Sequence, residues 1–348
     1  MEKDIKISVI IPVYNCQEYI TKCLDSFVSQ EFKDIEIICV NDGSKDNTLE
    51  VLKKYIEHHK KDRIILIDKE NAGVWYARID GIKKARGDYI VFCDSDDYVE
   101  RNYLSKMYNK IKEDNSDISI CGFYRVNSKN NKPYSIEMIT KKEDIYFDKN
   151  IEEIISVNTA LWNKIYKKEI LNGVSELKDP PRVLEDMMFL ALVYQNVNKI
   201  TFLPEPLYYY IVNSTSAMAS TNARDIEKTE KAMIKVKEIY SKNKCKKELM
   251  EILDCMAFLH FGISLMFRLS YTENKNFKEL FKNNKEFLNN NFNGYKKSKY
   301  LKIVYVLKRK SSNLKITIMK KIYSFGMFGI FLKVYRFMID KLKIDIKW

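Results

Sequence analysis

A short apolar run that ends in a cluster of carboxylates is the feature that most constrains the fold of this chain. Residues 89–93 are uncharged and rich in β-forming side chains, and a charged residue flanks them on each side. Such a run predicts a buried strand, most simply one in a parallel sheet. Asp94, Asp96 and Asp97 follow it. Because open α/β sheets bind ligands beyond the carboxyl ends of their strands, this stretch is a candidate binding site.

The chemistry of the carboxylates suggests a ligand. Asp94 and Asp96 are two positions apart, so their side chains point the same way if extended geometry continues through them. Two such carboxylates repel each other unless a positive charge lies between them. Oxygen ligands suit Mg²⁺ or Mn²⁺, which proteins hold with one or two carboxylates together with phosphate oxygens. The pattern therefore predicts a metal–diphosphate site. The alternative is a polar turn that caps a helix beginning near Glu100.

Strand-like and helix-like segments alternate along the first hundred residues. Strands are expected at 5–13, 35–40, 63–68 and 89–93, with helices between them. This order predicts right-handed βαβ units and a mostly parallel sheet flanked by helices. Pro12 has no N–H, so we expect it to end the regular pairing of the first strand. No G-x-G-x-x-G follows that strand, which argues against a dinucleotide-binding dehydrogenase.

Other polar residues fall at predicted strand ends and helix starts. Asp42 ends the second strand, which places it beside Asp94 in a parallel sheet. Asp46 and Asn47 are explained by capping of the next helix. Arg78 lies one turn into the third helix, where a helix start facing the strand ends suits an anion. The alternative for Arg78 is an ordinary surface position.

The positions of the cysteines and histidines limit the kinds of catalytic and metal site that can be expected. The seven cysteines form no C-x-x-C pair, and the start Met-Glu-Lys-Asp predicts no secretory leader, so we expect a reduced cytoplasmic protein. None of the three histidines lies near the acidic stretch. A Ser-His-Asp triad or a zinc site is therefore not expected there, and any general base is expected to be a carboxylate.

Charge is unevenly spread along the chain. Residues 1–222 carry 31 Lys and Arg against 35 Asp and Glu, whereas residues 223–348 carry 29 against 12. The shift predicts a domain boundary near residue 222, with a helical basic region at 223–348. It also suggests a polyanionic partner for that region, such as an anionic membrane surface or nucleic acid.

Five motifs in order resemble one family. They are Ser8–Asn15, Val40–Thr48, Glu70–Gly73, Ala77–Arg78 and Phe92–Asp97. Together they resemble the family-2 glycosyltransferases of the GT-A fold, of the bacterial surface-polysaccharide type. The resemblance is close over about residues 5–100 and looser over 155–216. It implies a GT-A-like α/β domain over residues 1–222 that binds a nucleotide sugar.

The resemblance also implies residue roles. Asp42 corresponds to the carboxylate that accepts a hydrogen bond from the nucleotide base, and Asp94 to the ribose-side member of a D-x-D motif. Asp96 corresponds to the residue that binds Mn²⁺ or Mg²⁺ on the diphosphate, with Asp94 as the second candidate ligand. The remaining expected contacts to the nucleotide sugar are Pro12, Tyr14, Asn15, Arg78 and Ser95.

A second acidic pair supplies the candidate base. Glu185 and Asp186 precede an apolar helix, where they could simply complement the helix dipole. The family carries an acidic pair here, which implies Asp186 as the general base and Glu185 as the runner-up. Trp162 and Lys164 match a W-x-K pattern. Trp162 is either a sugar platform or core, and Lys164 is expected near the diphosphate or acceptor.

One position departs from the family. The segment Leu207–Ser216 resembles a stretch that usually reads Tyr-x-Tyr-Arg, but Ile211 stands where the arginine is common. A contact to the donor diphosphate or to the acceptor is therefore either missing or supplied by another residue.

The rest of the chain is expected to be helical, at about 224–243, 246–270, 276–290, 297–310 and 313–343. The uncharged run 322–332 is too short to span a bilayer, which takes about 20 residues. Phenylalanines and basic residues in 313–348 fit an interfacial helix on anionic lipid. The phenylalanines are Phe325, Phe328, Phe331 and Phe337, and the basic residues are Lys320, Lys321, Lys333, Arg336, Lys341 and Lys343. Packing on the catalytic domain or in a homodimer is the alternative, and nucleic acid is not expected.

The sequence therefore predicts an inverting, metal-dependent glycosyltransferase. The expected donor is a nucleoside-diphosphate sugar, with a UDP-sugar as first choice, and the acceptor is a hydroxyl of a surface glycan or lipid-linked molecule. The expected location is cytoplasmic, or peripheral on the inner face of the membrane. Two alternatives remain: a sugar nucleotidyltransferase, and a non-catalytic scaffold that retains a nucleotide pocket.

Overall fold

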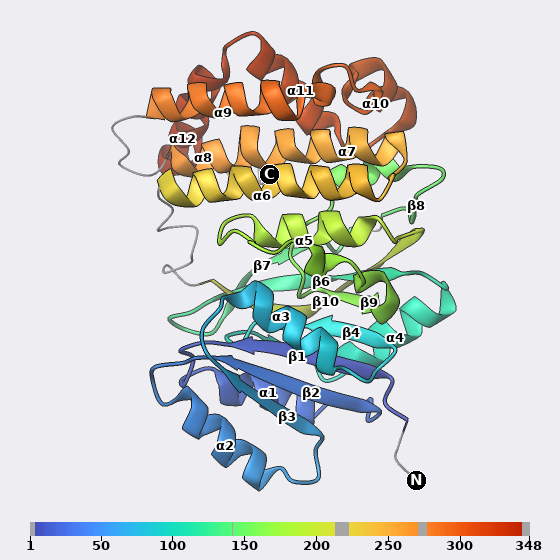
Figure 1. Cartoon of the computed structure of the whole chain (residues 1–348), viewed down its shortest axis with the longest axis vertical. Coiled ribbons are helices and arrows are strands. Elements are labelled where there is room, and N and C mark those ends of the chain that lie inside the picture. The colour runs from blue at the N-terminus through green and yellow to red at the C-terminus, as the bar shows by residue number, and fades with distance from the viewer. Residues whose placement is uncertain (1–3, 141, 213–222, 271–276, 343–348) are drawn as a thin grey trace. The chain divides into compact units, whose positions relative to one another are not determined.

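The computed structural model describes residues 4–140, 142–212, 223–270 and 277–342, which form two compact units (Figure 1). The first comprises Met1–Asp148 and Thr159–Ser216, and the second comprises Lys149–Asn158 and Ala217–Trp348. The sequence placed residues 149–158 in the first domain, whereas the structure groups them with the second. The predicted boundary at residue 222 and the end of the 207–216 segment lie outside the described residues.

A ten-stranded mixed sheet forms the centre of the first unit. Its order is β3-β2-β1-β4-β9-β6-β10-β5, with β7 paired to β6 and β8 paired to β10. The first four strands are parallel, as predicted, and β9 is antiparallel to both of its neighbours. The strands are β1 (Ile7–Val13), β2 (Ile35–Asp42), β3 (Ile64–Lys69), β4 (Tyr89–Phe92), β5 (Tyr98–Val99), β6 (Ile118–Asn127), β7 (Pro133–Glu137), β8 (Ile145–Tyr146), β9 (Lys164–Lys167) and β10 (Lys199–Val212).

Helices cover both faces of this sheet, which confirms the predicted α/β class. Alternate residues of a strand face opposite sides. Val9 faces a core that includes side chains of α1 and α4, whereas Ile10 faces α3, where a Cβ on Gly81 would come within 2.4 Å of it. Figure 1 shows α3 in front of the sheet and α1 behind it. The helices are α1 (Ile20–Val28), α2 (Thr48–His58), α3 (Val74–Lys84), α4 (Tyr103–Glu113) and α5 (Glu185–Tyr194), and the short 3₁₀ turns are η2 (Lys168–Leu171) and η3 (Val174–Glu176).

Pro12 does not end the pairing of β1, contrary to the prediction. It lies opposite Val40 of β2, and the strand continues to Val13. The register with β4 ends at Ile10. At Pro12, β1 is paired with β2 and no longer with β4. The missing N–H of Pro12 therefore interrupts no hydrogen bonds to β4.

The second unit is helical in its described residues. The elements are η1 (Ile151–Ser156), α6 (Ala223–Lys242), α7 (Lys247–Ala257), a π-helical segment η5 (Phe258–Leu265), α8 (Met266–Leu269), α9 (Phe277–Asn291), η6 (Asn293–Lys296), η7 (Lys299–Leu301), α10 (Ile303–Arg309), α11 (Leu314–Ser324) and α12 (Phe328–Leu342). Residues Lys247–Leu269 form a continuous helix long and apolar enough to cross a membrane, but 78% of its apolar window is buried. This degree of burial is typical of a core helix.

The prediction of one long helix at 313–343 is wrong in one respect. It is two helices, α11 and α12, separated by Phe325, Gly326 and Met327. Gly326 has φ +73°, a left-handed conformation that glycine adopts readily and that ends a helix. Residues 343–348, which include the predicted basic residue Lys343, lie outside the described residues.

Candidate functional site

The loops that follow β1 and β2 are tied together by hydrogen bonds. The Asn15 amide nitrogen donates to Ser44 Oγ at 3.0 Å, and Asn15 Oδ1 accepts from the Lys45 amide at 2.8 Å. The Cys16 amide donates to Thr48 Oγ1 at 2.8 Å. Asn15 has φ +47°, which asparagine tolerates better than most residues. This network leaves the Tyr14 side chain 46% exposed at the carboxyl edge of the sheet, where a planar ligand can stack on it.

Asp42 closes the loop between β3 and α3. Its Oδ1 accepts from the Ala72 amide at 2.9 Å, its Oδ2 accepts from the Gly73 amide at 2.7 Å, and its backbone carbonyl accepts from Asn71 Nδ2 at 2.8 Å. The residue is 3% exposed. Each carboxylate oxygen already serves one backbone donor, so a base N–H would have to use a remaining lone pair. Asp42 is thus held rigidly at its predicted position.

Arg78 is the centre of the charged cluster. It lies on α3 and is only 3% exposed, so the alternative of a surface residue is wrong. Its Nη1 is 2.7 Å from Asp186 Oδ1, and its Nη2 is 3.4 Å from Asp94 Oδ1. Burial alone would lower the pKa of Arg78, but the charges of Asp186 and Asp94 outweigh burial and raise it. The Arg78 guanidinium therefore joins the acidic turn after β4 to the start of α5, which is 108 residues away from Arg78.

The acidic stretch after β4 is a turn. The Asp97 amide donates to the Asp94 carbonyl at 3.1 Å, so extended geometry does not continue beyond the strand. The condition under which Asp94 and Asp96 would point the same way, continued extended geometry, is therefore not met. Burial is the main cause that raises the pKa of Asp94 to about 6; the charge of Arg78 opposes this rise, and the charges of Asp186 and Asp96 add to it. Ser95, between them, interacts with the Cys16 thiol and lowers its pKa, against the larger effect of burial, which raises it.

Asp97 is a residue that the sequence analysis left without a role. It is 1% exposed. Its Oδ2 accepts from Tyr208 Oη at 2.7 Å, and its Oδ1 accepts from the Ile211 amide at 2.7 Å. The Tyr208 hydroxyl in turn accepts from the Asp94 amide at 3.3 Å. Burial, and then the charge of Asp96, raise the pKa of Asp97 well above its ordinary value. Asp97 thus fixes the acidic turn to β10.

The hydrogen bond between Asp97 and Ile211 also shows what the residue at position 211 contributes to the site. Its backbone N–H, rather than its side chain, reaches the acidic turn, and the side chain is buried at 4% exposure. An arginine at this position would have to leave the core to reach a ligand. The one signal for this link in the sequence is that three carboxylates follow a single strand, more than a two-ligand metal site needs.

Glu185 and Asp186 form the first turn of α5, after Leu184 in a left-handed conformation at φ +59°. The Asp186 side chain is 28% exposed and pairs with Arg78. Burial, and then the charge of Asp186, raise the pKa of Glu185 to about 8. The two neighbours therefore differ at neutral pH, because Glu185 holds a proton there and Asp186 lies against a permanent cation.

Trp162 and Lys164 are both interior residues. The Trp162 ring is 6% exposed and stacks on Tyr208 and Tyr210 at centroid distances of 4.4 and 5.2 Å. This packing favours the core alternative over a sugar platform. Lys164 is fully buried, and its ammonium donates to the Ala160 carbonyl and to Asn163 Oδ1. Burial lowers the pKa of Lys164 to about 7. A side chain held in this way does not reach a ligand at the surface.

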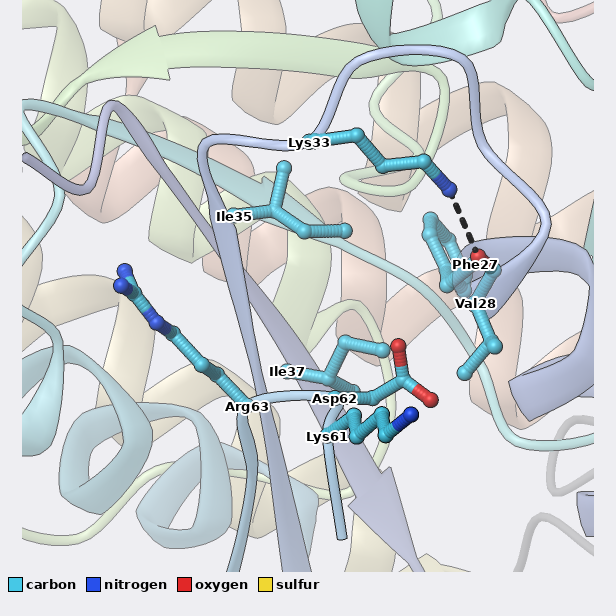
Figure 2. A pocket seen from close by; sticks show the side chains of 8 residues that line it. All are labelled: Phe27, Val28, Lys33, Ile35, Ile37, Lys61, Asp62 and Arg63. Carbon is cyan, nitrogen blue, oxygen red and sulfur yellow. Dashed lines mark hydrogen bonds between the residues drawn. The ribbon is translucent and has the colours of Figure 1, made fainter. Parts of the chain in front are cut away.

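A pocket of about 270 Å³ lies at the opposite edge of the sheet (Figure 2). Phe27 and Val28 of α1 and Ile35 at the start of β2 line it, and Figure 2 shows Lys33 donating to the Val28 carbonyl. The carboxylates lie at the carboxyl ends of β2 and β4, so this hollow does not contain them. We place the candidate site at the carboxyl edge, because ligands of open α/β sheets bind there.

The carboxyl edge fits a divalent cation that shares its ligands with a diphosphate. Within the described residues, no three His, Cys, Asp or Glu side chains gather closely enough to hold a metal alone. Asp94 and Asp96 supply two carboxylates on one turn, which suffices where phosphates and water provide the rest. Two carboxylates, Asp94 and Asp186, share the single guanidinium of Arg78, and buried Arg78 Nε finds no partner among the described residues. Both features suit a ligand that brings a cation and acceptor oxygens.

Comparison with known proteins identifies relatives for the first unit. Residues 8–172 match the protein family described as Glycosyl transferase family 2. The uncharacterized glycosyltransferase EpsJ of Bacillus subtilis is 35% identical over 217 residues, which are 60% of this chain and 62% of EpsJ. The glycosyltransferase GlyA of Streptococcus pneumoniae is 33% identical over 224 residues, which are 61% of this chain and 31% of GlyA. The chain thus spans less than two-thirds of the length of either relative.

A solved structure covers more of the chain. A fragment of TarS from Staphylococcus aureus, in complex with UDP-GlcNAc, has a TM-score of 0.66 and 25% sequence identity. The match covers 81% of this chain and 80% of the fragment. The similarity therefore extends beyond the segment that matches the family.

Proposed function

Because the chain belongs to the family-2 glycosyltransferases and has the GT-A fold that its motifs predicted, we propose a specific transfer reaction for it. It moves one sugar from a UDP-sugar to a hydroxyl of a cell-surface glycan or lipid-linked acceptor, in a single displacement that inverts the anomeric carbon. The observation that carries the proposal is the guanidinium of Arg78, which holds Asp186 at 2.7 Å and Asp94 at 3.4 Å. A candidate base and the candidate ribose-side carboxylate of the D-x-D motif thereby meet at one point.

Asp186 is the proposed general base. An acceptor hydroxyl must lose its proton as it attacks, and a positioned carboxylate can take that proton. Glu185 is the weaker candidate, because its raised pKa of about 8 leaves it protonated at neutral pH. Asp186 is partly exposed and faces the same guanidinium as Asp94, so an acceptor can approach it from solvent. Arg78 holds the Asp186 carboxylate in place.

The donor is proposed to lie over the carboxyl ends of β1, β2 and β4. UDP-GlcNAc is the ligand in the related TarS structure, which supports a uridine nucleotide here. Tyr14 offers an exposed ring for the base, and Asp42, buried at the end of β2, has lone pairs left over. Asp96 and Asp94 would hold Mn²⁺ or Mg²⁺. Such an ion, when bound, offsets the charge that develops on the departing diphosphate.

The cellular setting belongs to the same proposal. All seven cysteines are free thiols, five of them in the first unit. Free buried thiols fit a reducing compartment. We therefore propose that transfer takes place on the cytoplasmic side of the membrane, where the acceptor is extended.

Ligand-dependent stability tests the donor site. UDP, GDP, CDP and UDP-sugars are added with and without Mn²⁺, and the unfolding temperature is measured. A ligand at about 100 times its Kd raises the free energy of unfolding by about 2.7 kcal/mol. We expect a shift with UDP and UDP-sugars that depends on Mn²⁺ and is lost in Asp96→Ala. Asp88→Ala, at the other end of β4, is the matched control and should keep the shift.

Product analysis separates the proposal from its two rivals. We expect release of UDP from a UDP-sugar only when an acceptor is present, with an inverted anomeric linkage in the product by NMR. Release of pyrophosphate from a sugar phosphate and a nucleoside triphosphate would instead identify a nucleotidyltransferase. Donor binding without transfer to any membrane or glycan extract would favour a scaffold.

A further inference from the structure

The last two described helices of the second unit leave a row of large apolar side chains in solvent. We call it the α11–α12 surface. Exposure of its members ranges from 45% for Ile318 to 74% for Phe325. The surface consists of Ile318, Phe325, Met327, Ile330, Val334 and Phe337. Isolated exposed apolar residues are ordinary, but such a number on consecutive elements marks an interaction site.

Helix periodicity shows that this exposure is systematic. In α12, Ile330, Val334 and Phe337 have spacings of four and three, so they share one face. Phe328 and Leu332 fall on the other face and are buried at 0% and 3%. The helix thus already uses one apolar face for the core and has a second one left over. The sequence analysis placed Phe328 on the lipid-facing side, and the structure places it in the core.

The two helices share this surface at their junction. In α11, Ile318 and Lys321 lie three residues apart on one face, and both are exposed. That face continues to Phe325, at the turn that Gly326 creates. Met327, on the other side of the turn, is 47% exposed and leads into the exposed face of α12. The apolar residues therefore form a continuous series through the turn.

The charged residues of α11 and α12 are basic, with Asp340 as the one acidic residue in the sequence of the two helices. Lys321, Lys333 and Lys341 are exposed on the same two helices. Between Glu286 and Asp340 the sequence contains no Asp or Glu. Lysines carry apolar stems and keep their ammonium groups in the headgroup region, so apolar and basic residues side by side match an anionic lipid–water interface.

This charge pattern argues against a second copy of the chain as the occupant. A two-fold contact places the same patch of each subunit against itself. Here that would bring several lysines of each copy near one another, with Asp340 as the one acidic residue that α11 and α12 of each copy contain. Neither helix crosses a bilayer, because α11 has 11 residues and α12 has 15, whereas a span takes about 20.

We propose that the α11–α12 surface binds an anionic lipid bilayer, with its apolar side chains at the acyl boundary and its lysines at the headgroups. This inference is independent of the proposed transferase function, since it uses no residue of the carboxyl-edge site. It does give the enzyme a location at which a lipid-linked acceptor is present.

Vesicle co-sedimentation of the full chain tests the proposal. The probes are vesicles of pure phosphatidylcholine and vesicles that also contain phosphatidylglycerol. We expect binding that requires the anionic lipid and weakens at high salt. In the variant Lys321→Gln/Lys333→Gln/Lys341→Gln, the partition coefficient should fall at least about 10-fold, since each basic residue contributes about 1 kcal/mol near an anionic surface.

A second variant tests the apolar part. Phe325→Ser/Ile330→Ser/Phe337→Ser should reduce binding at least about 10-fold, because each buried CH₂ group contributes about 0.8 kcal/mol. The matched control changes three exposed apolar residues of the first unit, namely Tyr134→Ser/Ile136→Ser/Ile139→Ser. The control for the lysines is Lys60→Gln/Lys84→Gln/Lys129→Gln. Both controls should bind as the unchanged protein does.

Three results would overturn the proposal. One is equal sedimentation with neutral and anionic vesicles. Another is binding that the control triples reduce as much as the surface variants do. The third is a homodimer in lipid-free solution, seen by light scattering, that the Phe325→Ser/Ile330→Ser/Phe337→Ser variant dissociates, because the occupant would then be a second copy. The lysine variant and the salt dependence remain decisive even if the apolar variant folds poorly.

Discussion

Each unit contains a partly or fully buried ion pair, and the two pairs differ in their balance of charge. In the first unit, Arg78 faces Asp94 and Asp186, whose side chains are 34% and 28% exposed. In the second unit, Lys237 of α6 pairs with Asp254 of α7 at 2.7 Å, and the Asp254 side chain is 9% exposed. The first centre has more carboxylates than cations and is open to solvent, so we call it the open centre. The second has one carboxylate for one ammonium and a buried carboxylate, so we call it the closed centre.

The closed centre has its hydrogen bonds satisfied from several directions. Asp254 Oδ2 accepts from the Gly294 amide at 2.8 Å, and a Cβ on Gly294 would lie 2.4 Å from that oxygen. The Lys237 ammonium also donates to the Asn291 carbonyl. Such a centre holds helices together and has no room for a ligand. The open centre keeps excess negative charge that an incoming cation or proton can neutralise, and this imbalance distinguishes a functional site from a structural one.

The largest effect is expected when a carboxylate of the open centre is replaced. Asp186→Asn should lower the turnover number by about 10²–10⁴, the usual contribution of a general base. The unfolding temperature shift with UDP-sugar should remain, because the candidate metal ligands are untouched. Turnover is measured as UDP release in the presence of acceptor. Glu185→Gln is the matched control, and a larger loss in that variant would transfer the role of base to Glu185.

The second largest effect is expected when the carboxylate of the closed centre is removed. Asp254→Ala leaves Lys237 without its carboxylate in a partly buried position, so the free energy of unfolding should fall by about 3 kcal/mol. Turnover per folded molecule should stay unchanged. Chemical denaturation and activity assays measure the two quantities. Glu279→Ala, an exposed change on α9 of the same unit, should affect neither. Loss of turnover in folded Asp254→Ala would remove the distinction between the two centres.

The positions of the site residues were more predictable than their contacts. Asp42, Asp94 and Asp186 stand at ends of strands or starts of helices, and element boundaries follow from hydrophobic pattern and local polar residues. The fold class could therefore be predicted from the alternation of strands and helices. The contact between Arg78 and Asp186 joins residues 108 positions apart and depends on how α3 and α5 pack.

Long-range packing also decided the roles of Asp97 and Lys164. The bond from Tyr208 to Asp97 spans 111 residues, and the sequence indicates it only through the third carboxylate that follows β4. Lys164 matches a family motif, which favoured a ligand contact, but β9 places it between β4 and β6 in the interior. A motif gives the residue type at a position, whereas the side on which the strand presents that residue depends on the register with its neighbours.

The third expected effect is the smallest per step because it is spread over several pH units. It concerns Lys164, a buried cation of the first unit whose pKa moves opposite to that of Arg78. Burial lowers the pKa of Lys164 from 10.5 to about 7, whereas carboxylates raise the pKa of Arg78. Between pH 7 and 10.5 the unfolded chain therefore binds more protons at Lys164 than the folded chain does. The free energy of unfolding should rise with pH in this window, by up to about 1.4 kcal/mol per pH unit.

Lys164→Met removes this dependence, so the variant should gain stability relative to the unchanged protein most strongly below pH 7, and this gain should shrink towards pH 10. Denaturant titrations at pH 6, 7.5 and 9 measure it, with the exposed Lys84→Met as the control for loss of a charge. A stability difference that is the same at every pH would mean that Lys164 stays charged in the fold. A carboxylate would then balance Lys164 as carboxylates balance Arg78.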